Sequence, residues 1–356
     1  MAWDTSNLEG IRSCAGFVKG WLEARDVEVR DAIFNGRPVL AASVGPEDAP
    51  TIIFHGHLDV VPAHPEQFDP QVEGDRLIGR GAYDMKGGLA AMMLATVELA
   101  ERSDIRVHFV CVCDEESDET ELRASDWLVK HGYVGDFAIT GEPTDLMIGV
   151  QAKGVLALRV TFHGRAAHGS TPWHGDNAVL KALHGFRRIE QMEWAQESSE
   201  LFPRPSINLG RIMGGDALNK VPDRCVTDLD IRYLPGQDAD AIEREIGALD
   251  AVDVRRVFHR SPILVERDNA YVQLLARAIE ADAEAERISV GRDGTSDAIS
   301  FLEAGVPAVE FGPVGGGHHG PEEWVSISSL DRYRQALVTF AGLAAGGTET
   351  THLRIA

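Results

Sequence analysis

The sequence predicts an α/β protein in which a mostly parallel sheet forms the main domain and an α+β domain is inserted into it. In the first half of the chain, β-branched and apolar runs alternate with helical segments, which is typical of a parallel sheet with crossover helices. Between about residues 153 and 262 the order changes to strand–helix–strand–strand–helix–strand. Alternation of helix and strand then resumes. A chain of 356 residues is therefore expected to hold a discontinuous main domain and a second domain.

In the main domain, one strand is predicted before a long helix in the sequence and three strands are predicted after it. Thr51–His57 (TIIFHGH) has the apolar character of a buried strand. Lys86–Glu101 is rich in Ala, Leu and Met after a glycine pair, which favours a helix. Further strands are predicted at Ile105–Cys113, Asp136–Gly141 and Pro307–Gly312.

The inserted segment has the element order of a split βαβ, ferredoxin-like layer. Its strands and helices are predicted, in chain order, at Val155–His163, Asp176–Met192, Ser206–Met213, Arg224–Tyr233, Asp238–Leu249 and Val252–Phe258. We therefore expect one domain at 153–262 and a main domain made of 1–152 and 263–341. Residues 342–356 are predicted to form a disordered tail.

Composition narrows the classes of protein to consider. The chain has a formal net charge of −22, which opposes non-specific binding to nucleic acid or to anionic lipid. No apolar run approaches the roughly 18–20 residues of a membrane span. The start, MAWDTSNLEG, lacks the pattern of a signal peptide, and four cysteines are too few for a disulfide scaffold. We expect a cytoplasmic protein that binds neither nucleic acid nor membranes.

The acidic composition also raises the question of whether the protein is adapted to high salt. Only six of the 34 basic residues are lysines, and an acidic, lysine-poor surface suits a protein that stays soluble at high salt. An ordinary acidic protein from a GC-rich genome has the same composition. Composition alone does not choose between the two readings.

Polar residues that can carry chemistry follow the predicted strands directly. Ligands bind to open α/β sheets at this edge, outside the carboxyl ends of the strands. The segments concerned are HGHLD, GRGAYDMKGG just before a helix, CDEE, GEPT and GGGHHG, and they supply His57, Asp59, Asp84, Glu115, Glu116, Glu142, His318 and His319.

Each of these segments is weak evidence by itself. A lone His-x-Asp is usually a surface turn, and CDEESDETE resembles a solvated charge run. GRGAYDMKGG is rich in glycine but has neither the dinucleotide-binding nor the phosphate-loop spacing, which disfavours a dinucleotide-binding protein. Their joint occurrence at equivalent ends of one sheet indicates a metal site.

Two imidazoles and three carboxylates fit a pair of divalent ions, Zn²⁺ or Co²⁺. A bridging carboxylate would hold such ions roughly 3.5–4 Å apart. Glu115, as the spare carboxylate, could take a proton from water, and Asp59 could hydrogen-bond the second nitrogen of His57 and orient it. Neighbouring strand residues point to opposite faces, so Glu115 and Glu116 are expected to differ in role.

Together these motifs resemble the M20 family of zinc aminoacylases and peptidases. The closest likeness is to the branch that holds succinyl-diaminopimelate desuccinylase and acetylornithine deacetylase. The resemblance rests on HGHLDVVP, GRGAYDMKGG, the DEE triplet, GEPT and a late histidine before PEEWV, in family order. It extends to about Ala341.

The resemblance implies a role for each metal-site residue. One zinc would be bound by His57, Asp84 and Glu142, and the other by Asp84, Glu116 and His319, with Asp84 as the bridge. Glu115 would be the general base and acid, with Asp59 as the orienting residue. The preference for His319 over His318 rests on its spacing to the Glu323-Trp324-Val325 segment.

The resemblance also identifies the insert as a lid and dimerisation domain. GRAAHGSTP (164–172) matches the segment whose histidine, here His168, reaches the partner subunit's active site and stabilises an oxyanion. A locally hydrogen-bonded loop histidine is the alternative. The remaining matches look like substrate contacts: Asn219, Arg232, Gly294, Thr295 and Ser296.

Two of these contacts have structural alternatives that the sequence leaves open. Arg232 suits a substrate carboxylate, because guanidinium and carboxylate pair bidentately, but it could instead pair with Asp228 or Asp230. Thr295 or Ser296 could simply cap a helix.

The resemblance implies that a homodimer hydrolyses the N-acyl amide bond of a small N-acyl amino acid. N-succinyl-diaminopimelate is the leading substrate, which would place the enzyme in amino-acid biosynthesis. N-acetylornithine, another N-acyl amino acid and a dipeptide stay open as substrates. A metal-binding protein that has lost catalysis is the alternative from a different class.

Overall fold

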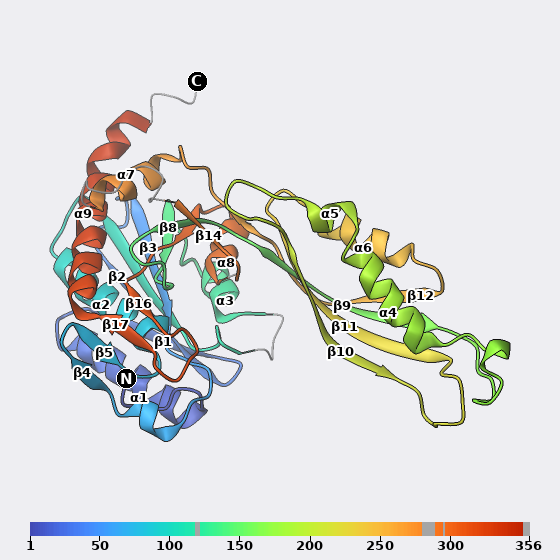
Figure 1. Cartoon of the computed structure of the whole chain (residues 1–356). Helices are drawn as coiled ribbons and strands as arrows, with labels where there is room; N and C mark the ends of the chain where they lie inside the picture. The colour runs from blue at the N-terminus through green and yellow to red at the C-terminus, as the bar shows by residue number, and fades with distance from the viewer. Residues whose placement is uncertain (118–121, 280–288, 295, 352–356) are drawn as a thin grey trace. The chain divides into compact units, whose positions relative to one another are not determined.

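The computed structural model describes residues 1–117, 122–279, 289–294 and 296–351. The chain divides into two compact units (Figure 1). The larger unit consists of Met1–Val150, Val265–Val290 and Ser296–Ala356, and the smaller unit of Gln151–Leu264 and Gly291–Thr295. The smaller unit thus contains the expected insert and adds a short later segment.

A sheet with a parallel centre lies mainly in the larger unit. The strand order is β1-β2-β6-β3-β7-β15-β8-β13, with β14 paired to β8. Strand β3 is parallel to β6 and β7, and β15 is parallel to β7, whereas the β1, β2 and β8 pairings are antiparallel. The bounds are β1 Val29–Phe34, β2 Arg37–Val44, β3 Thr51–His57, β6 Arg106–Val112, β7 Phe137–Thr140, β8 Ile148–Ala152, β13 Ile263–Leu264, β14 Ser289–Arg292 and β15 Ala308–Glu310.

Helices cover both faces of this sheet, which explains why its central strands are apolar on both sides. Figure 1 shows α2, α7 and α9 on one side and α3 and α8 on the other, while α1 packs on β1 and β2. Ile52, Ile53 and Phe54 of β3 are accordingly inaccessible to solvent. The helix bounds are α1 Leu8–Glu23, α2 Gly87–Leu99, α3 Ala124–Lys130, α7 Ala270–Ala278, α8 Ala298–Glu303 and α9 Ile327–Thr351.

The glycine pair that opens α2 lets the helix begin against the polar edge of the sheet. A Cβ on Gly87 would lie 2.4 Å from the carbonyl oxygen of Ala82, and one on Gly88 would lie 2.9 Å from that of Gly141. Side chains at these positions would push the helix away from the turn that carries Asp84. The close approach therefore requires glycine.

A small sheet joins two motifs that are far apart in the sequence. Its order is β16-β17-β5-β4, in which β17 pairs antiparallel with β5 so that Trp324 faces Ile78. This pairing brings GRGAYDMKGG next to HHGPEE. The bounds are β4 Gln71–Glu73, β5 Arg76–Ile78, β16 Gly315–Gly316 and β17 Trp324–Ser326.

The smaller unit has an antiparallel sheet in the order β10-β11-β9-β12, the arrangement of a ferredoxin-like split βαβ layer. Helices α4 and α6 pack on it around a core of buried apolar residues, including Leu158, Ile189 and Ile246. The predicted fold class is therefore confirmed. The bounds are β9 Gly154–His163, α4 Ala178–Ile189, α5 Glu193–Gln196, β10 Ser206–Gly214, β11 Arg224–Tyr233, α6 Ala239–Gly247 and β12 Val252–Arg260.

The predicted disordered tail is wrong for residues 342–351, because α9 continues to Thr351. Phe340, Ala341 and Ala344 are fully buried, and α9 packs on α2 and α7. This packing stabilises a helix through a glycine-rich stretch that has weak helical propensity of its own. Residues 352–356 lie outside the described residues. Within the described part of the chain, no helix is long and apolar enough to span a membrane.

Candidate metal centre and active site

The candidate ligands gather where the parallel strands of the larger unit end. His57 is the last residue of β3, Glu115 and Glu116 follow β6, and Glu142 follows β7. Parallel register aligns these ends, since His57 lies opposite Val112 of β6 and the N–H of Gly141 donates to the carbonyl of His55. Asp84 comes from the turn before α2.

His57 lies close to both of the residues that are expected to share the first ion with it, Asp84 and Glu142. His57 Nε2 lies 3.2 Å from Asp84 Oδ1 and 3.8 Å from Glu142 Oε1. Atoms that bind one zinc at 2.0–2.2 Å lie roughly 3.3–3.6 Å from each other. Among the described residues, the buried Glu142 Oε1 has no hydrogen-bond partner, and a buried oxygen of this kind needs one. A cation between these side chains would satisfy it.

The second oxygen of Asp84 faces another group of donors. Asp84 Oδ2 lies 3.2 Å from His319 Nε2, and His319 Nε2 lies 2.9 Å from Glu116 Oε1. One carboxylate therefore contacts nitrogen donors with both of its oxygens. His57, Asp84 and Glu116 also form a compact group that could hold an ion.

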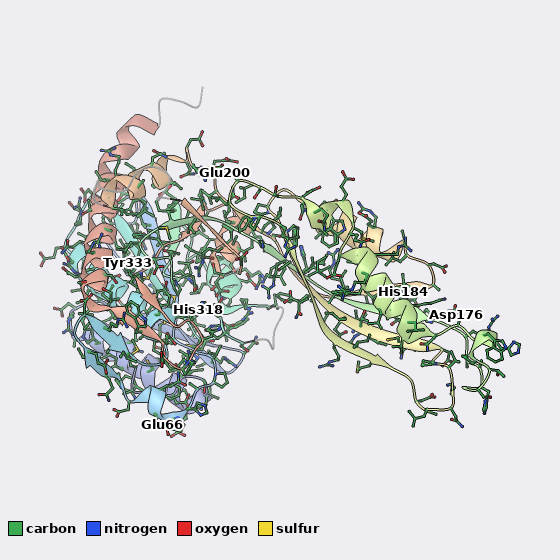
Figure 2. All side chains as sticks on the ribbon, in the orientation of Figure 1. Glu66, Asp176, His184, Glu200, His318 and Tyr333 are labelled. Carbon is green, nitrogen blue, oxygen red and sulfur yellow. The ribbon has the colours of Figure 1, made fainter. Side chains whose placement is uncertain are left out.

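His318 is as close to this group as its neighbour. His318 Nε2 lies 2.5 Å from Asp84 Oδ2, and its ring meets the His319 ring edge to face, with centroids 4.2 Å apart. Figure 2 labels His318 in the larger unit. Asp84, His318 and His319 form a second compact group of donors. Of the two histidines, His319 also lies 2.9 Å from Glu116 Oε1, and its choice as the ligand stays a prediction.

Asp59 orients the site differently from the way its sequence position predicts. The Nδ1 atom of His57 is hydrogen-bonded to the backbone carbonyl of Asp59 at 3.0 Å, while Asp59 Oδ1 lies 3.6 Å from that nitrogen. The carboxylate instead accepts from the backbone N–H of Glu116, at Oδ2, over 2.9 Å. The residue thus holds His57 through its carbonyl and Glu116 through its side chain, while Asp59 Oδ1 has no hydrogen-bond partner among the described residues.

The pKa values of the carboxyl groups in this cluster shift in different directions because their surroundings differ. Burial raises the pKa of Glu115 well above its usual range, and Asp297, Glu116 and Asp84 add to this although His57 opposes it. Burial likewise raises the pKa of Glu142, with Asp84 adding to it. Burial opposes ionisation of Asp84 too, but hydrogen bonds from the histidines outweigh it and hold its pKa well below the usual range. Such divergent carboxyl groups in one site are typical of catalytic centres.

Residues 53–342 match the model of peptidase family M20/M25/M40. The chain belongs to this family.

Curated relatives in this family carry a more specific name. The chain is 30% identical over 321 residues to a succinyl-diaminopimelate desuccinylase of Leptothrix cholodnii, covering 82% of this chain and 83% of that one. It is 30% identical to a succinyl-diaminopimelate desuccinylase of Xanthomonas euvesicatoria, over 79% of this chain and 80% of the relative. A probable succinyl-diaminopimelate desuccinylase of Staphylococcus epidermidis is 26% identical, over 94% of both chains.

Solved structures support the same fold. An aminopeptidase from Bacillus cereus matches with a TM-score of 0.76 and 20% identity, over 94% of this chain and 93% of that one. An M20 family metallo-carboxypeptidase from Sulfolobus solfataricus matches with a TM-score of 0.72 and 20% identity, over 94% of both chains. As a member of the M20 family, the chain is a hydrolytic enzyme that acts on amide bonds.

In this M20 hydrolase the smaller unit brings two predicted site segments together. The N–H of Gly169, next to His168, donates to the carbonyl of Asn219 at 2.6 Å. His168 itself is hydrogen-bonded to Ser170, the local pairing that was the alternative to a catalytic role. The two observations place the His168 loop beside the Asn219 loop.

The other predicted substrate contacts have structural partners or fall outside the described residues. Arg232 donates from Nε and Nη2 to both oxygens of Asp230, at 2.9 and 3.1 Å, as its structural alternative predicts. Ser296 is buried, and its hydroxyl accepts from the N–H of Ala298 at the start of α8. Thr295 lies outside the described residues, and Gly294 is exposed.

Sequence reasoning missed a polar chain that adjoins the candidate base. His55 Nε2 is 2.8 Å from Ser125 Oγ, and Ser125 Oγ donates to Asp297 at 2.7 Å. Asp297 is one of the charges that raise the pKa of Glu115. It directly follows Gly294, Thr295 and Ser296, which are predicted to contact substrate, so the neighbouring residues were the signal that could have identified it.

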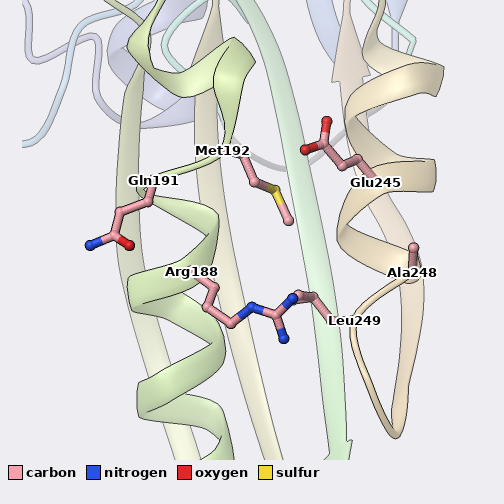
Figure 3. Close-up of a pocket in the computed structure, with 6 residues that line it drawn as sticks. All are labelled: Arg188, Gln191, Met192, Glu245, Ala248 and Leu249. Carbon is pink, nitrogen blue, oxygen red and sulfur yellow. The ribbon is translucent and has the colours of Figure 1, made fainter.

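A hollow in the smaller unit is separate from all predicted site residues. It has a volume of about 360 Å³ and lies between the end of α4 and α6 (Figure 3). Charged, polar and apolar side chains line it together: Arg188, Gln191, Met192, Glu245, Ala248 and Leu249. It contains none of the donor groups of the metal centre.

Proposed function

We propose that this enzyme is a metal-dependent N-acyl-amino-acid amidohydrolase that removes the succinyl group from an N-succinyl-diaminopimelate-like substrate. The observation that carries the proposal is the double contact of Asp84, whose oxygens face His57 on one side and His319 on the other. The names of relatives at 30% identity over about four fifths of the chain support the substrate.

The proposed dinuclear centre follows from the donor set. His57, Asp84 and Glu142 would hold one ion, and Asp84, Glu116 and His319 the other. Imidazole and carboxylate donors together suit Zn²⁺, with Co²⁺ as the substitute. When bound, such ions polarise the acyl oxygen and lower the pKa of water.

Glu115 is the proposed general base and acid. It accepts a proton from the attacking water and returns it to the departing amine. Its raised pKa suits a carboxyl that must hold the proton between these two events. Asp59 keeps His57 in one tautomer, because the carbonyl that accepts from Nδ1 leaves Nε2 as the donor atom for a cation.

His168 is the proposed oxyanion donor. The N–H of Ser170 donates to its Nδ1 at 3.2 Å, so Nδ1 is the acceptor and the proton of the neutral ring lies on Nε2. Nε2 is therefore the atom that we propose stabilises the tetrahedral intermediate. We place it in the active site of the partner subunit of a homodimer.

The smaller unit supplies a surface on which such a dimer could form. Strand β10 lies at an edge of its sheet, and Ile212 and Met213 on this strand are exposed. An uncovered edge strand is prone to pair with another chain. We propose that two copies associate through this edge, as the lid and dimerisation role requires.

Substrate contacts are proposed for Asn219, Arg232, Gly294, Thr295 and Ser296. Arg232, already held by Asp230, would present its remaining guanidinium N–H groups to a substrate carboxylate.

We also propose a cytoplasmic location and a role in amino-acid biosynthesis. The four cysteines, all within the described residues, are buried free thiols, which is in keeping with a reducing compartment such as the cytoplasm.

Metal depletion followed by add-back tests the reaction and the acyl preference together. The metal-free enzyme is assayed with N-succinyl-diaminopimelate, N-acetylornithine and a dipeptide, each before and after Zn²⁺ or Co²⁺ is added. We expect activity only after metal addition and the highest kcat/KM for the succinyl substrate. A preference for the acetyl substrate or the dipeptide would overturn the substrate assignment. Metal binding without hydrolysis of any substrate would identify a protein that has lost catalysis.

A further inference from the structure

Arg80 and Glu323 form a buried ion pair beside the candidate metal centre. Arg80 Nη1 donates to Glu323 Oε2 at 2.6 Å, and the two residues are 3% and 1% exposed. Neither belongs to the proposed ligand set. Further hydrogen bonds must offset the lost hydration of charges this well buried, so the other partners of the pair are informative. Among the described residues, Arg80 Nε has no hydrogen-bond partner, whereas both Nη atoms and both carboxylate oxygens of Glu323 have partners.

The carboxylate of Glu323 binds the backbone of the turn that carries Asp84. Glu323 Oε2 also accepts from the N–H of Gly81 at 3.1 Å. Glu323 Oε1 accepts from the N–H groups of Tyr83 and Asp84 at 2.9 and 3.0 Å. The turn therefore wraps around one carboxylate, and one of these bonds is made by the backbone of the proposed bridging residue itself.

The guanidinium of Arg80 binds the backbone of the loop that carries His319. Its Nη2 donates to the carbonyl of His319 at 3.0 Å and to that of Gly320 at 3.1 Å. His319 has a φ of +58°, in the left-handed region that residues with a side chain seldom adopt. Such a conformation persists when its surroundings hold it in place, and Arg80 supplies two of the bonds that do so.

The ion pair thus connects the segments that carry two ligands of the proposed second ion site, Asp84 and His319. Asp84 and His319 are 235 positions apart by number, yet each has its backbone bonded to one member of the same ion pair. Pairing of β5 with β17 joins the same segments, and the ion pair extends this connection to the ligands.

We propose that Arg80 and Glu323 are positioning residues that hold Asp84 and His319 in the geometry that binds the second metal ion. This inference rests on the proposed dinuclear function. Partners that orient metal ligands typically change metal affinity by roughly 10–100-fold when they are altered. Lysine cannot replace the arginine, since its single ammonium lacks the planar fork that donates in two directions.

The test compares metal affinities of the full-length chain and does not depend on turnover. Metal-free Arg80→Lys and Glu323→Gln proteins are titrated with Co²⁺ and with Zn²⁺ in the presence of a competing chelator. Arg159→Lys is the matched control, because Arg159 pairs with Asp228 through Nε and Nη2 in the smaller unit. We expect the weaker dissociation constant to rise roughly 10–100-fold in the first two variants and to be unchanged in the control.

A role in stability alone would give a different result. Thermal unfolding of the metal-free proteins would then shift in Arg80→Lys and Glu323→Gln while both dissociation constants stayed at the wild-type values, and the inference would be wrong. If Glu323→Gln does not fold, Arg80→Lys decides the question by the same measurement. A wild-type protein that binds fewer than two ions would contradict the proposed function itself, and this inference with it.

Discussion

Replacement of Glu115 by glutamine separates metal binding from proton transfer. Glutamine has nearly the same shape but cannot accept a proton from water at neutral pH. Glu115 is not among the ligands proposed for either ion, which are His57, Asp84, Glu116, Glu142 and His319. We therefore expect Glu115→Gln to retain both ions while losing turnover.

The size of the loss follows from the surroundings of Glu115. General acid–base catalysis contributes about 10²–10⁴-fold, which is about 3–5 kcal/mol of barrier at 1.36 kcal/mol per tenfold. The nearby carboxylate of Asp297 accepts a hydrogen bond from Ser125, and that of Asp59 accepts one from the N–H of Glu116. Because Ser125 and the N–H of Glu116 already bond to these neighbours, leaving Asp59 Oδ1 without a hydrogen-bond partner among the described residues, we expect a loss of about 10²–10⁴-fold in kcat with little change in KM.

The assay combines steady-state kinetics on the N-succinyl substrate with metal analysis of the same preparation. Glu142→Gln serves as the comparison, since Glu142 is a proposed ligand and its loss should reduce the metal content. A general base contributes at least about 10²-fold to the rate. If Glu115→Gln keeps more than about one tenth of wild-type kcat, the loss is smaller than this minimum and the base is another group. If Glu115→Gln loses metal as Glu142→Gln does, its carboxylate is a ligand and the division of roles is wrong.

The other predictions concern the remaining histidines. His319→Ala should lower the stoichiometry of tightly bound metal from two ions toward one, whereas His318→Ala should keep both; the reverse pattern on metal analysis would make His318 the ligand. Mixed dimers of His168→Ala and Glu115→Gln subunits should regain activity, because one of the two sites then combines an intact base with an intact donor, and inactive mixtures would contradict donation across a dimer. Burial lowers the pKa of His108 in the folded protein to about 4, whereas a histidine in the unfolded chain has a pKa of about 6.5. As the pH falls below about 6.5, His108 is therefore protonated in the unfolded chain before it is protonated in the folded protein. The free energy of unfolding of the metal-free protein should therefore drop by about 3 kcal/mol between pH 6.5 and pH 4 through this residue. His108→Gln should show a smaller drop in denaturant titrations than the exposed-site control His184→Gln, and equal drops would refute this.

Much of the larger unit could be predicted because its elements are coded locally. Thr51–His57 is a strand with the predicted bounds, since a run of apolar and β-branched residues needs burial on both faces. The helix predicted at Lys86–Glu101 is α2, Gly87–Leu99. Helix propensity and turn residues act over a few positions, so these elements can be predicted without knowing what the segment packs against.

Interactions between distant segments could not be read in this way. The continuation of α9 through its glycines depends on burial of Phe340 and Ala344 against other helices. Asp59 orients His57 through a carbonyl because its carboxylate accepts from Glu116, a contact made only when two strand ends meet. Arg80 and Glu323 are 243 positions apart, and no local pattern marks two such residues as partners.

The sequence by itself determined the fold class, the segments that end at the polar edge, and the residue types that favour a divalent metal. Only the tertiary structure decided which atoms face each other: Asp84 between His57 and His319, the unpartnered oxygen of Glu142, and the Arg80–Glu323 pair. The reason is physical. Local propensity acts over a turn or a strand, whereas the contacts that give these groups their charge state and orientation form only when strand ends and loops from the whole chain exclude water together.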